Sequence, residues 1–114
     1  MSKSDCIFCK IVSGEIPAKV VERGDGVIAI EDVNPQAPVH ILVLPEKHVA
    51  NIAAHTASGT SDDVAHLMRA AAKIGEKHAG GFRLVVNTGA DGGQTVDHLH
   101  VHVLAGRHMS WPPG

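Results

Sequence analysis

Apolar and polar positions alternate most regularly near the C-terminal end, between residues 97 and 104. Histidines occupy positions 98, 100 and 102. The aliphatic residues Leu99, Val101 and Val103 alternate with them. This alternation predicts a strand whose successive side chains face opposite sides of a sheet. We therefore expect the three imidazoles on one face, about 7 Å apart along the strand, with the aliphatic side chains packed in a core behind them.

Shorter apolar runs predict the rest of the fold. Residues 20–22 and 27–31 are expected to form a hairpin around the turn at 23–26, and further strands are expected at 40–44 and 82–87. Apolar positions at helical spacing predict a short helix from an Asp5 cap to about Val12, and a long helix from about Ser61 to His78. Ser61 or Asp62 is the expected cap of the long helix. Together these elements predict an α+β domain with a mostly antiparallel sheet of about five strands, one long helix and one short helix.

Composition narrows the class of protein. The 114 residues suit one domain, and a net charge of −2 with neutral histidines gives no basic field that would attract nucleic acid. No apolar run reaches the length of a membrane span, and the N-terminus lacks the apolar segment of a signal peptide. We therefore expect a cytoplasmic protein without a membrane partner. An open sheet has two edges to cover, which favours a dimer.

The two cysteines, Cys6 and Cys9, are spaced as C-x-x-C at the start of the chain. A structural disulfide is not expected in the cytoplasm. A thioredoxin-like redox pair normally follows a strand, and none is predicted before these residues. Half of a zinc site, completed by two of the nine histidines, is the better interpretation.

A glycine-rich loop, residues 87–95, leads into the histidine run. Glycines let main-chain N–H groups approach an anion, and the Asn87 amide and the Thr95 hydroxyl add donors. The loop alone is more typical of a simple turn between strands. The histidines alone are compatible with metal binding, anion binding, nucleophilic or acid–base chemistry, or no role. Phosphate donors that lead directly into a row of imidazoles favour a nucleophile beside an oxyanion site.

The His-x-His-x-His run with apolar intervening residues resembles the histidine-triad (HIT) superfamily of nucleotide-binding proteins. The resemblance extends to residues 7–18, 32–48 and 87–114, and the closing Trp-Pro-Pro-Gly resembles the Hint branch. Residues 55–61 look like a variable loop. The resemblance implies a HIT-like fold, with residues 1–114 forming a single HIT domain, and a homodimer.

The implied activity is that of a purine nucleoside phosphoramidase, which cleaves the P–N bond between a purine nucleoside monophosphate and an amine. By this resemblance His100 is the nucleophile that forms a nucleotidyl-histidine, and His40 orients it. His102 binds phosphate oxygens. The residues that would bind phosphate with it are Asn87, Gly93, Gln94 and Thr95.

The resemblance also implies the remaining contacts of the nucleotide. Asp32 would accept hydrogen bonds from the ribose hydroxyls, and Trp111 would reach the active site of the partner subunit. The residues expected to line the purine site, or to pack simply in the core, are Ile7, Phe8, Ile11, Ile30 and Val33.

Cys6 and Cys9 resemble the pair that bacterial relatives use for structural zinc, and by that pattern His48 and His98 complete the ligand set. A ligated imidazole cannot shuttle protons, so His98 is either a zinc ligand or a member of the catalytic network. Two other functions stay open: hydrolysis of dinucleoside polyphosphates or adenylyl sulfate, and nucleotide sensing or scaffolding without catalysis. The Trp-Pro-Pro-Gly ending argues against the former. The presence of His40, His100, His102 and Asn87 argues against the latter.

Overall fold

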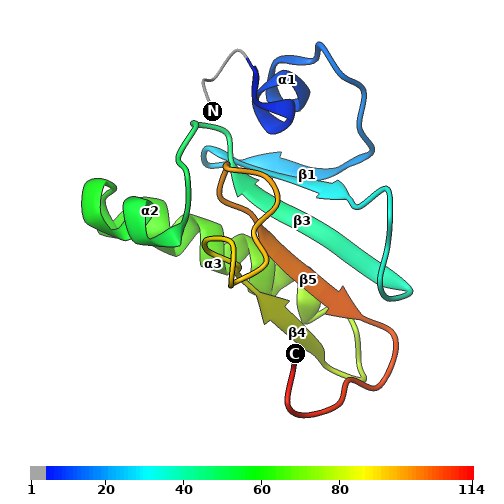
Figure 1. Ribbon diagram of the computed structural model, residues 1–114. Helices are drawn as coiled ribbons and strands as arrows, with labels where there is room; N and C mark the ends of the chain where they lie inside the picture. The colour runs from blue at the N-terminus through cyan, green and yellow to red at the C-terminus, as the bar shows by residue number, and fades with distance from the viewer. Residues whose placement is uncertain (1–4) are drawn as a thin grey trace.

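The computed structural model describes residues 5–114, in which helices pack on a single antiparallel sheet (Figure 1). The strands lie in the order β1-β2-β3-β5-β4, and every neighbouring pair is antiparallel. This architecture confirms the predicted α+β class and the five strands. The strands are β1 (Val20–Gly24), β2 (Val27–Glu31), β3 (Val39–Pro45), β4 (Phe82–Val85) and β5 (Val101–Ala105), and the helices are α1 (Ile7–Ser13), α2 (Ile52–Ser58) and α3 (Ser61–Gly75).

Alternation along the central strands gives the sheet two apolar faces. Ile41 and Val43 of β3 pack with Leu67 and Ile74 of α3 in one buried cluster, which also contains the odd-numbered aliphatic residues of β5. Leu42 and Leu44 belong to a second cluster on the opposite face, which includes Phe8 of α1. His40 and His102 share the strand periodicity of Leu42, so they belong to the α1 face of the sheet.

The N-terminal caps of both predicted helices differ from expectation. Cys6, not Asp5, caps α1, because its Sγ accepts from the main-chain N–H of Cys9 at 3.4 Å. Thr60 caps α3 in place of Ser61 or Asp62. Its hydroxyl accepts from the N–H of Asp63, and the Asp63 carboxylate accepts from the N–H of Thr60. The earlier cap of α3 is favoured because this reciprocal pair satisfies two donors at once.

Four of the predicted elements have the wrong boundaries. The expected loop at 55–61 contains the last turn of α2 and the cap of α3, and Asn51 caps α2 through Ala54. The long helix ends at Gly75, so His78 lies outside it. The last two strands are also shorter than expected, and among the three histidines only His102 lies within a strand. Among the described residues, no helix has the length and apolar character needed to span a membrane.

Residues 98–100 lie outside the sheet because they make hydrogen bonds to the end of β3 and to the segment that follows it. The main-chain N–H of Leu99 donates to the carbonyl of Val49 at 2.8 Å, and the Pro45 carbonyl accepts from the His98 side chain. Since both groups are used in this way, residues 98–100 form a separate segment beyond the last β3–β5 pair, Val43 with Val101. This segment turns the His98 side chain toward α1.

Candidate functional site

Four side chains from three separate segments form a compact sulfur and nitrogen cluster. The ligand atoms of Cys6, Cys9, His48 and His98 all lie within 4.8 Å of one another. Cys6 Sγ is 3.3 Å from His98 Nδ1, and Cys9 Sγ is 3.3 Å from His48 Nδ1. Two thiols and two imidazoles are the donor set of a tetrahedral structural zinc site.

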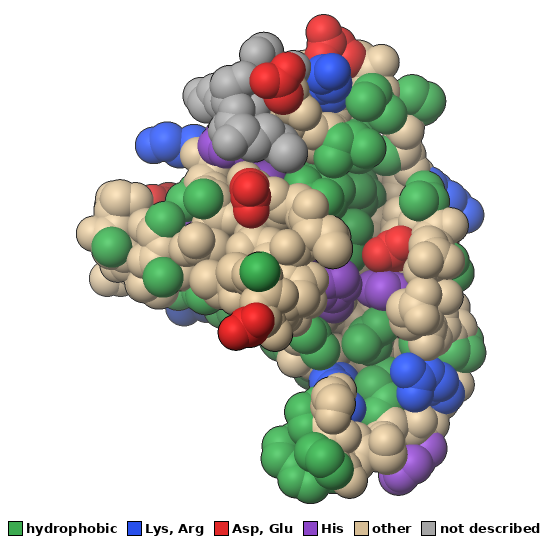
Figure 2. Space-filling view, viewed as in Figure 1, with side chains coloured by type: hydrophobic (Ala, Val, Ile, Leu, Met, Phe, Trp, Pro, Cys, Tyr) green, Lys and Arg blue, Asp and Glu red, His purple; other side chains and the backbone are tan. Residues whose placement is uncertain are grey.

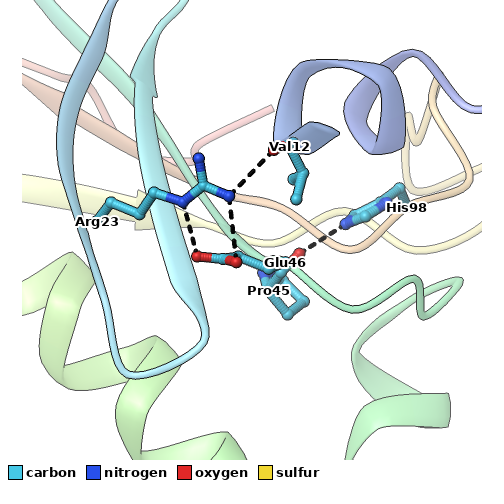
Figure 3. Close-up of polar contacts among 5 residues, drawn as sticks. All are labelled: Val12, Arg23, Pro45, Glu46 and His98. Carbon is cyan, nitrogen blue, oxygen red and sulfur yellow. Dashed lines mark hydrogen bonds and ion pairs between the residues drawn. The ribbon is translucent and has the colours of Figure 1, made fainter. Parts of the chain in front are cut away.

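The hydrogen bond at the far side of the His98 ring fixes which nitrogen faces the cysteines. His98 Nε2 lies 2.8 Å from the carbonyl oxygen of Pro45 (Figure 3). A carbonyl only accepts, so Nε2 carries the proton and Nδ1 presents its lone pair to the two thiols. Burial lowers the pKa of His98, which favours the neutral ring that a metal requires. The orientation therefore fits a zinc ligand supported by a main-chain carbonyl.

An ion pair fastens the helix that carries the cysteines. Arg23 of β1 donates from Nε to Glu46 at 2.9 Å and from one terminal nitrogen to the Val12 carbonyl at 3.0 Å (Figure 3). Glu46 directly follows Pro45, the residue that holds the His98 ring. The C-terminal end of α1 and the end of β3 are thus joined beside the sulfur and nitrogen cluster.

A main-chain carbonyl fixes the tautomer of His100. Its Nδ1 lies 2.7 Å from the main-chain carbonyl of His98, so Nδ1 donates a proton and Nε2 keeps its lone pair. The ring is buried, and Phe8 packs edge-on against it with 5.0 Å between ring centroids. An imidazole whose position is fixed and whose Nε2 is unprotonated is suited to attack an electrophilic phosphorus.

His40, His102 and Asp32 form a second polar group. The main-chain N–H of Gln36 donates to His40 Nδ1 at 3.0 Å, so a neutral His40 carries its proton on Nε2. That nitrogen lies 2.9 Å from His102 Nδ1 and 3.4 Å from Asp32 Oδ2. His102 Nδ1 therefore accepts, and the proton of the His102 ring is on Nε2.

Burial keeps both rings neutral. It lowers the pKa of His102 to about 4, and it lowers the pKa of His40 although the nearby Asp32 carboxylate opposes that shift. The centroids of the His100 and His102 rings are 5.0 Å apart. The rings of His40, His102 and His100 therefore lie side by side. Histidine side chains are visible in a hollow of the surface, with an acidic side chain beside them (Figure 2).

The residues expected around the base are divided between the core and the surface. Phe8 and Ile30 are buried in the apolar cluster on the α1 face, and Ile11 packs against it. Ile7 is half exposed, whereas Val33 is 99% exposed and makes no core contact. Within this set, the Phe8 ring packs edge-on against the rings of His98 and His100.

The glycine-rich loop folds back on itself through Gln94. The Gln94 side chain donates to the carbonyls of Ala50 and Val96 at 2.7 and 3.0 Å, and it accepts from the N–H of Gly89. Gly93 adopts a φ of 82°, which favours glycine, and an added Cβ there would lie 4.0 Å from the Asn87 amide nitrogen. Asn87 and Gly93 are thus close together, while the Thr95 side chain is exposed.

The C-terminal segment extends away from the core. Trp111 is 82% exposed, and Arg83 of β4 holds the segment by donating to the Ser110 carbonyl at 3.0 Å. Within one chain, Trp111 is thus a surface side chain.

Sequence reasoning missed the groups that set the proton positions, because they are main-chain atoms. The carbonyls of Pro45 and His98 and the N–H of Gln36 fix the tautomers of His98, His100 and His40. No side-chain pattern identifies a main-chain donor or acceptor, so these groups become visible only in the folded chain.

Comparison with known protein families identifies the domain to which this chain is similar. A model of the HIT domain matches residues 13–109 of the chain. An uncharacterized HIT-like protein of Synechococcus elongatus is 47% identical over 112 residues, which cover 96% of this chain and 97% of that protein. A 14 kDa zinc-binding protein of Brassica juncea is 43% identical over 113 residues, covering 96% and 100%.

Solved structures with the same architecture include a HIT family hydrolase from Legionella pneumophila, with a TM-score of 0.86 and 43% identity, covering 96% of this chain and all of that one. A Zn-bound histidine triad family protein from Mycobacterium smegmatis has a TM-score of 0.80 and 29% identity, covering 93% and 78%. The zinc in these relatives and the donor set formed by Cys6, Cys9, His48 and His98 agree on a structural zinc site in this chain.

Proposed function

Because the chain belongs to the HIT domain family, we propose that it is a nucleotide-binding hydrolase that cleaves the P–N bond of purine nucleoside phosphoramidates. The observation that carries this proposal is the tautomer of His100. Its Nδ1–H is bound to the His98 carbonyl, which leaves the Nε2 lone pair available for attack.

In the first step, His100 Nε2 attacks the α-phosphorus and forms a new P–N bond. The bond from phosphorus to the substrate nitrogen breaks, and the amine leaves with the electron pair and takes up a proton. The imidazole becomes positively charged as this happens, and the hydrogen bond from Nδ1 to the His98 carbonyl stabilises that charge. Water then attacks the phosphorus, the P–N bond to His100 breaks, and the nucleoside monophosphate is released.

The neighbouring side chains would bind the phosphate and the nucleoside. His102 would donate from Nε2 to a phosphate oxygen, because its Nδ1 is occupied by His40. Asn87, Gly93 and Thr95 would add donors, and Gln94 would fix the loop that presents them. Asp32 would accept from the ribose hydroxyls. Phe8, Ile11 and Ile30 would form the wall of the purine site, with Ile7 and Val33 at its exposed edge.

Zinc would have a structural role. Bound by Cys6, Cys9, His48 and His98, it would join α1 to the segment that follows β3 and to the segment that precedes β5. Four protein ligands leave no position for substrate. In this arrangement His98 acts on the chemistry through its main-chain carbonyl, while its ring is committed to the cluster.

We further propose a cytoplasmic homodimer in which Trp111 contacts the active site of the partner subunit. The exposure of Trp111 and the open edge of β4 support this arrangement. Neither nucleic acid nor a membrane is a proposed partner, in line with the net charge of −2.

A direct assay separates this activity from the hydrolysis of related nucleotides. Purified protein would be given adenosine phosphoramidate or diadenosine polyphosphate under the same conditions, and release of adenosine monophosphate would be measured. Preferential turnover of the phosphoramidate supports the proposal. Preferential turnover of the polyphosphate would assign the chain to the other reaction, and tight binding without turnover of either would make it a nucleotide sensor.

A further inference from the structure

The loop between β2 and β3 presents Asp32 and His40 and is closed by its own hydrogen bonds. The N–H of Asn34 donates to Asp32 Oδ1 at 2.8 Å, and the Gln36 side chain donates to the Asn34 carbonyl at 3.0 Å. The N–H of Asp32 donates to the His40 carbonyl at 3.0 Å. Within this loop, Gln36 makes the contact that fixes the His40 ring, through its main-chain N–H.

Gln36 is held in turn from outside the loop. Arg107, two residues beyond the end of β5, donates from Nε to the Gln36 carbonyl at 3.0 Å. A second guanidinium nitrogen donates to the His108 carbonyl at 3.0 Å. The neighbouring residue Gly106 lies so close to the loop that an added Cβ would be 2.9 Å from Pro38. The end of β5 thus contacts the loop at two adjacent points.

We propose that Arg107 is a positioning residue for the hydrolysis. By holding the Gln36 carbonyl, the guanidinium keeps the Gln36 N–H directed at His40 Nδ1. That bond places the His40 proton on Nε2, next to His102 Nδ1, and leaves the His102 proton on Nε2, where it can be donated to substrate. The effect on catalysis rests on the proposed phosphoramidase activity, whereas the effect on the two rings does not.

Loss of the Arg107 contact would permit the opposite order of protons. One proton on each ring would move from Nε2 to Nδ1 through solvent, after which His102 would donate to His40. His102 Nε2 would then carry a lone pair and would repel a phosphate oxygen. Both rings are neutral, so this exchange alters the direction of hydrogen bonding and leaves the net charge unchanged.

Arg83 provides a matched control. Both arginines donate to a main-chain carbonyl of the C-terminal segment: Arg107 to that of His108 and Arg83 to that of Ser110. Of the two, Arg107 also donates to the loop, at the Gln36 carbonyl. The variants Arg107→Ala, Arg107→Lys and Arg83→Ala would be compared with the unaltered zinc-containing protein. Two readouts are needed: the kcat and KM for adenosine phosphoramidate, and the ¹⁵N chemical shifts of the imidazole nitrogens, which differ between protonated and unprotonated positions.

Arg107→Ala is expected to change the ring ¹⁵N shifts of His40 and His102 and to lower kcat about tenfold relative to Arg83→Ala. Arg107→Lys, which keeps a cationic donor, should recover part of both effects. Unchanged ring shifts in Arg107→Ala, equal shifts in Arg83→Ala, or altered shifts with an unchanged kcat would overturn the proposal. If the unaltered protein cleaves no phosphoramidate, the proposed function fails, and the ¹⁵N comparison still decides whether Arg107 sets the tautomers.

Discussion

Removal of zinc is expected to lower the free energy of unfolding of the chain, by an amount that depends on the ratio of the free zinc concentration to the Kd. Cys6 and His98 are both 0% exposed, so the apo protein must keep a thiol and an imidazole buried without the metal that satisfies them. At a free zinc concentration about 100 times the Kd, binding contributes about 2.7 kcal/mol to the free energy of unfolding. For a domain of this size, that corresponds to a fall in Tm of about 10 °C.

The assay is calorimetry on protein from which zinc has been removed with a chelator, with metal content verified, beside the zinc-loaded form. A double variant, Cys6→Ser with Cys9→Ser, should melt at the lower temperature with or without chelator. His108→Ala, which alters an exposed histidine outside the cluster, should keep the full response to zinc. Equal Tm values for the zinc-loaded and zinc-free wild type would refute the reasoning, because the metal would then stabilise nothing.

Three further expectations follow from burial and packing. Burial lowers the pKa of His102 to about 4 from the ordinary 6.5, so the unfolded chain binds more protons than the folded chain between these pH values. The free energy of unfolding should therefore fall as the pH drops from 6.5 toward 4. Urea titrations should show a smaller fall for the variant His102→Gln. An added Cβ at Gly75 would lie 2.3 Å from the Phe82 ring, so Gly75→Ala should cost about 1–3 kcal/mol in urea unfolding, whereas Gly80→Ala, with open space around it, should cost much less. Deleting residues 110–114 should change the rate of hydrolysis and the preference for the leaving amine more than it changes nucleotide affinity, and the dimer should persist. A monomer in sedimentation, or equal losses of rate for two substrates that differ only in the amine, would contradict the proposed place of Trp111.

The sequence predicted the sheet because its strands have strong local patterns. The β2 prediction at residues 27–31 agrees with the structure residue for residue, and β3 differs by one residue at each end. These strands are central and buried, so their aliphatic runs are long and unbroken. The fold class followed from the same runs.

The local sequence pattern gave a wrong prediction at the histidine run, where hydrogen bonds to distant main-chain carbonyls replace strand pairing. The histidine run alternates like a strand, yet His98 and His100 lie outside β5, because the carbonyl of Pro45 binds the His98 ring and Leu99 N–H binds Val49. The helix α2 was missed because residues 55–61, which include its C-terminal half, were interpreted as a variable loop. A contact between residues fifty or more positions apart leaves no local signal in the sequence.

The side chains of the zinc site were predicted from the sequence, whereas the proton positions of the histidines were not. The Cys-x-x-Cys spacing indicated half of a metal site, and the structure brings His48 and His98 to the same point. The direction of each imidazole depends on main-chain carbonyls and amides, which every residue type supplies equally. In the proposed reaction, those directions would decide which ring attacks the phosphorus and which ring donates to the phosphate.

The central claim is that His100 forms a covalent bond to the nucleotide through Nε2, and a trapped intermediate tests it most directly. Protein mixed with adenosine phosphoramidate and quenched at early times would be digested and analysed by mass spectrometry. The account predicts an added adenosine monophosphate on His100, which is absent from His100→Ala, and turnover by that variant below a tenth of the wild-type rate with nucleotide affinity retained within about tenfold. An adduct on another residue, or a variant that keeps a tenth of the rate or more, would contradict it.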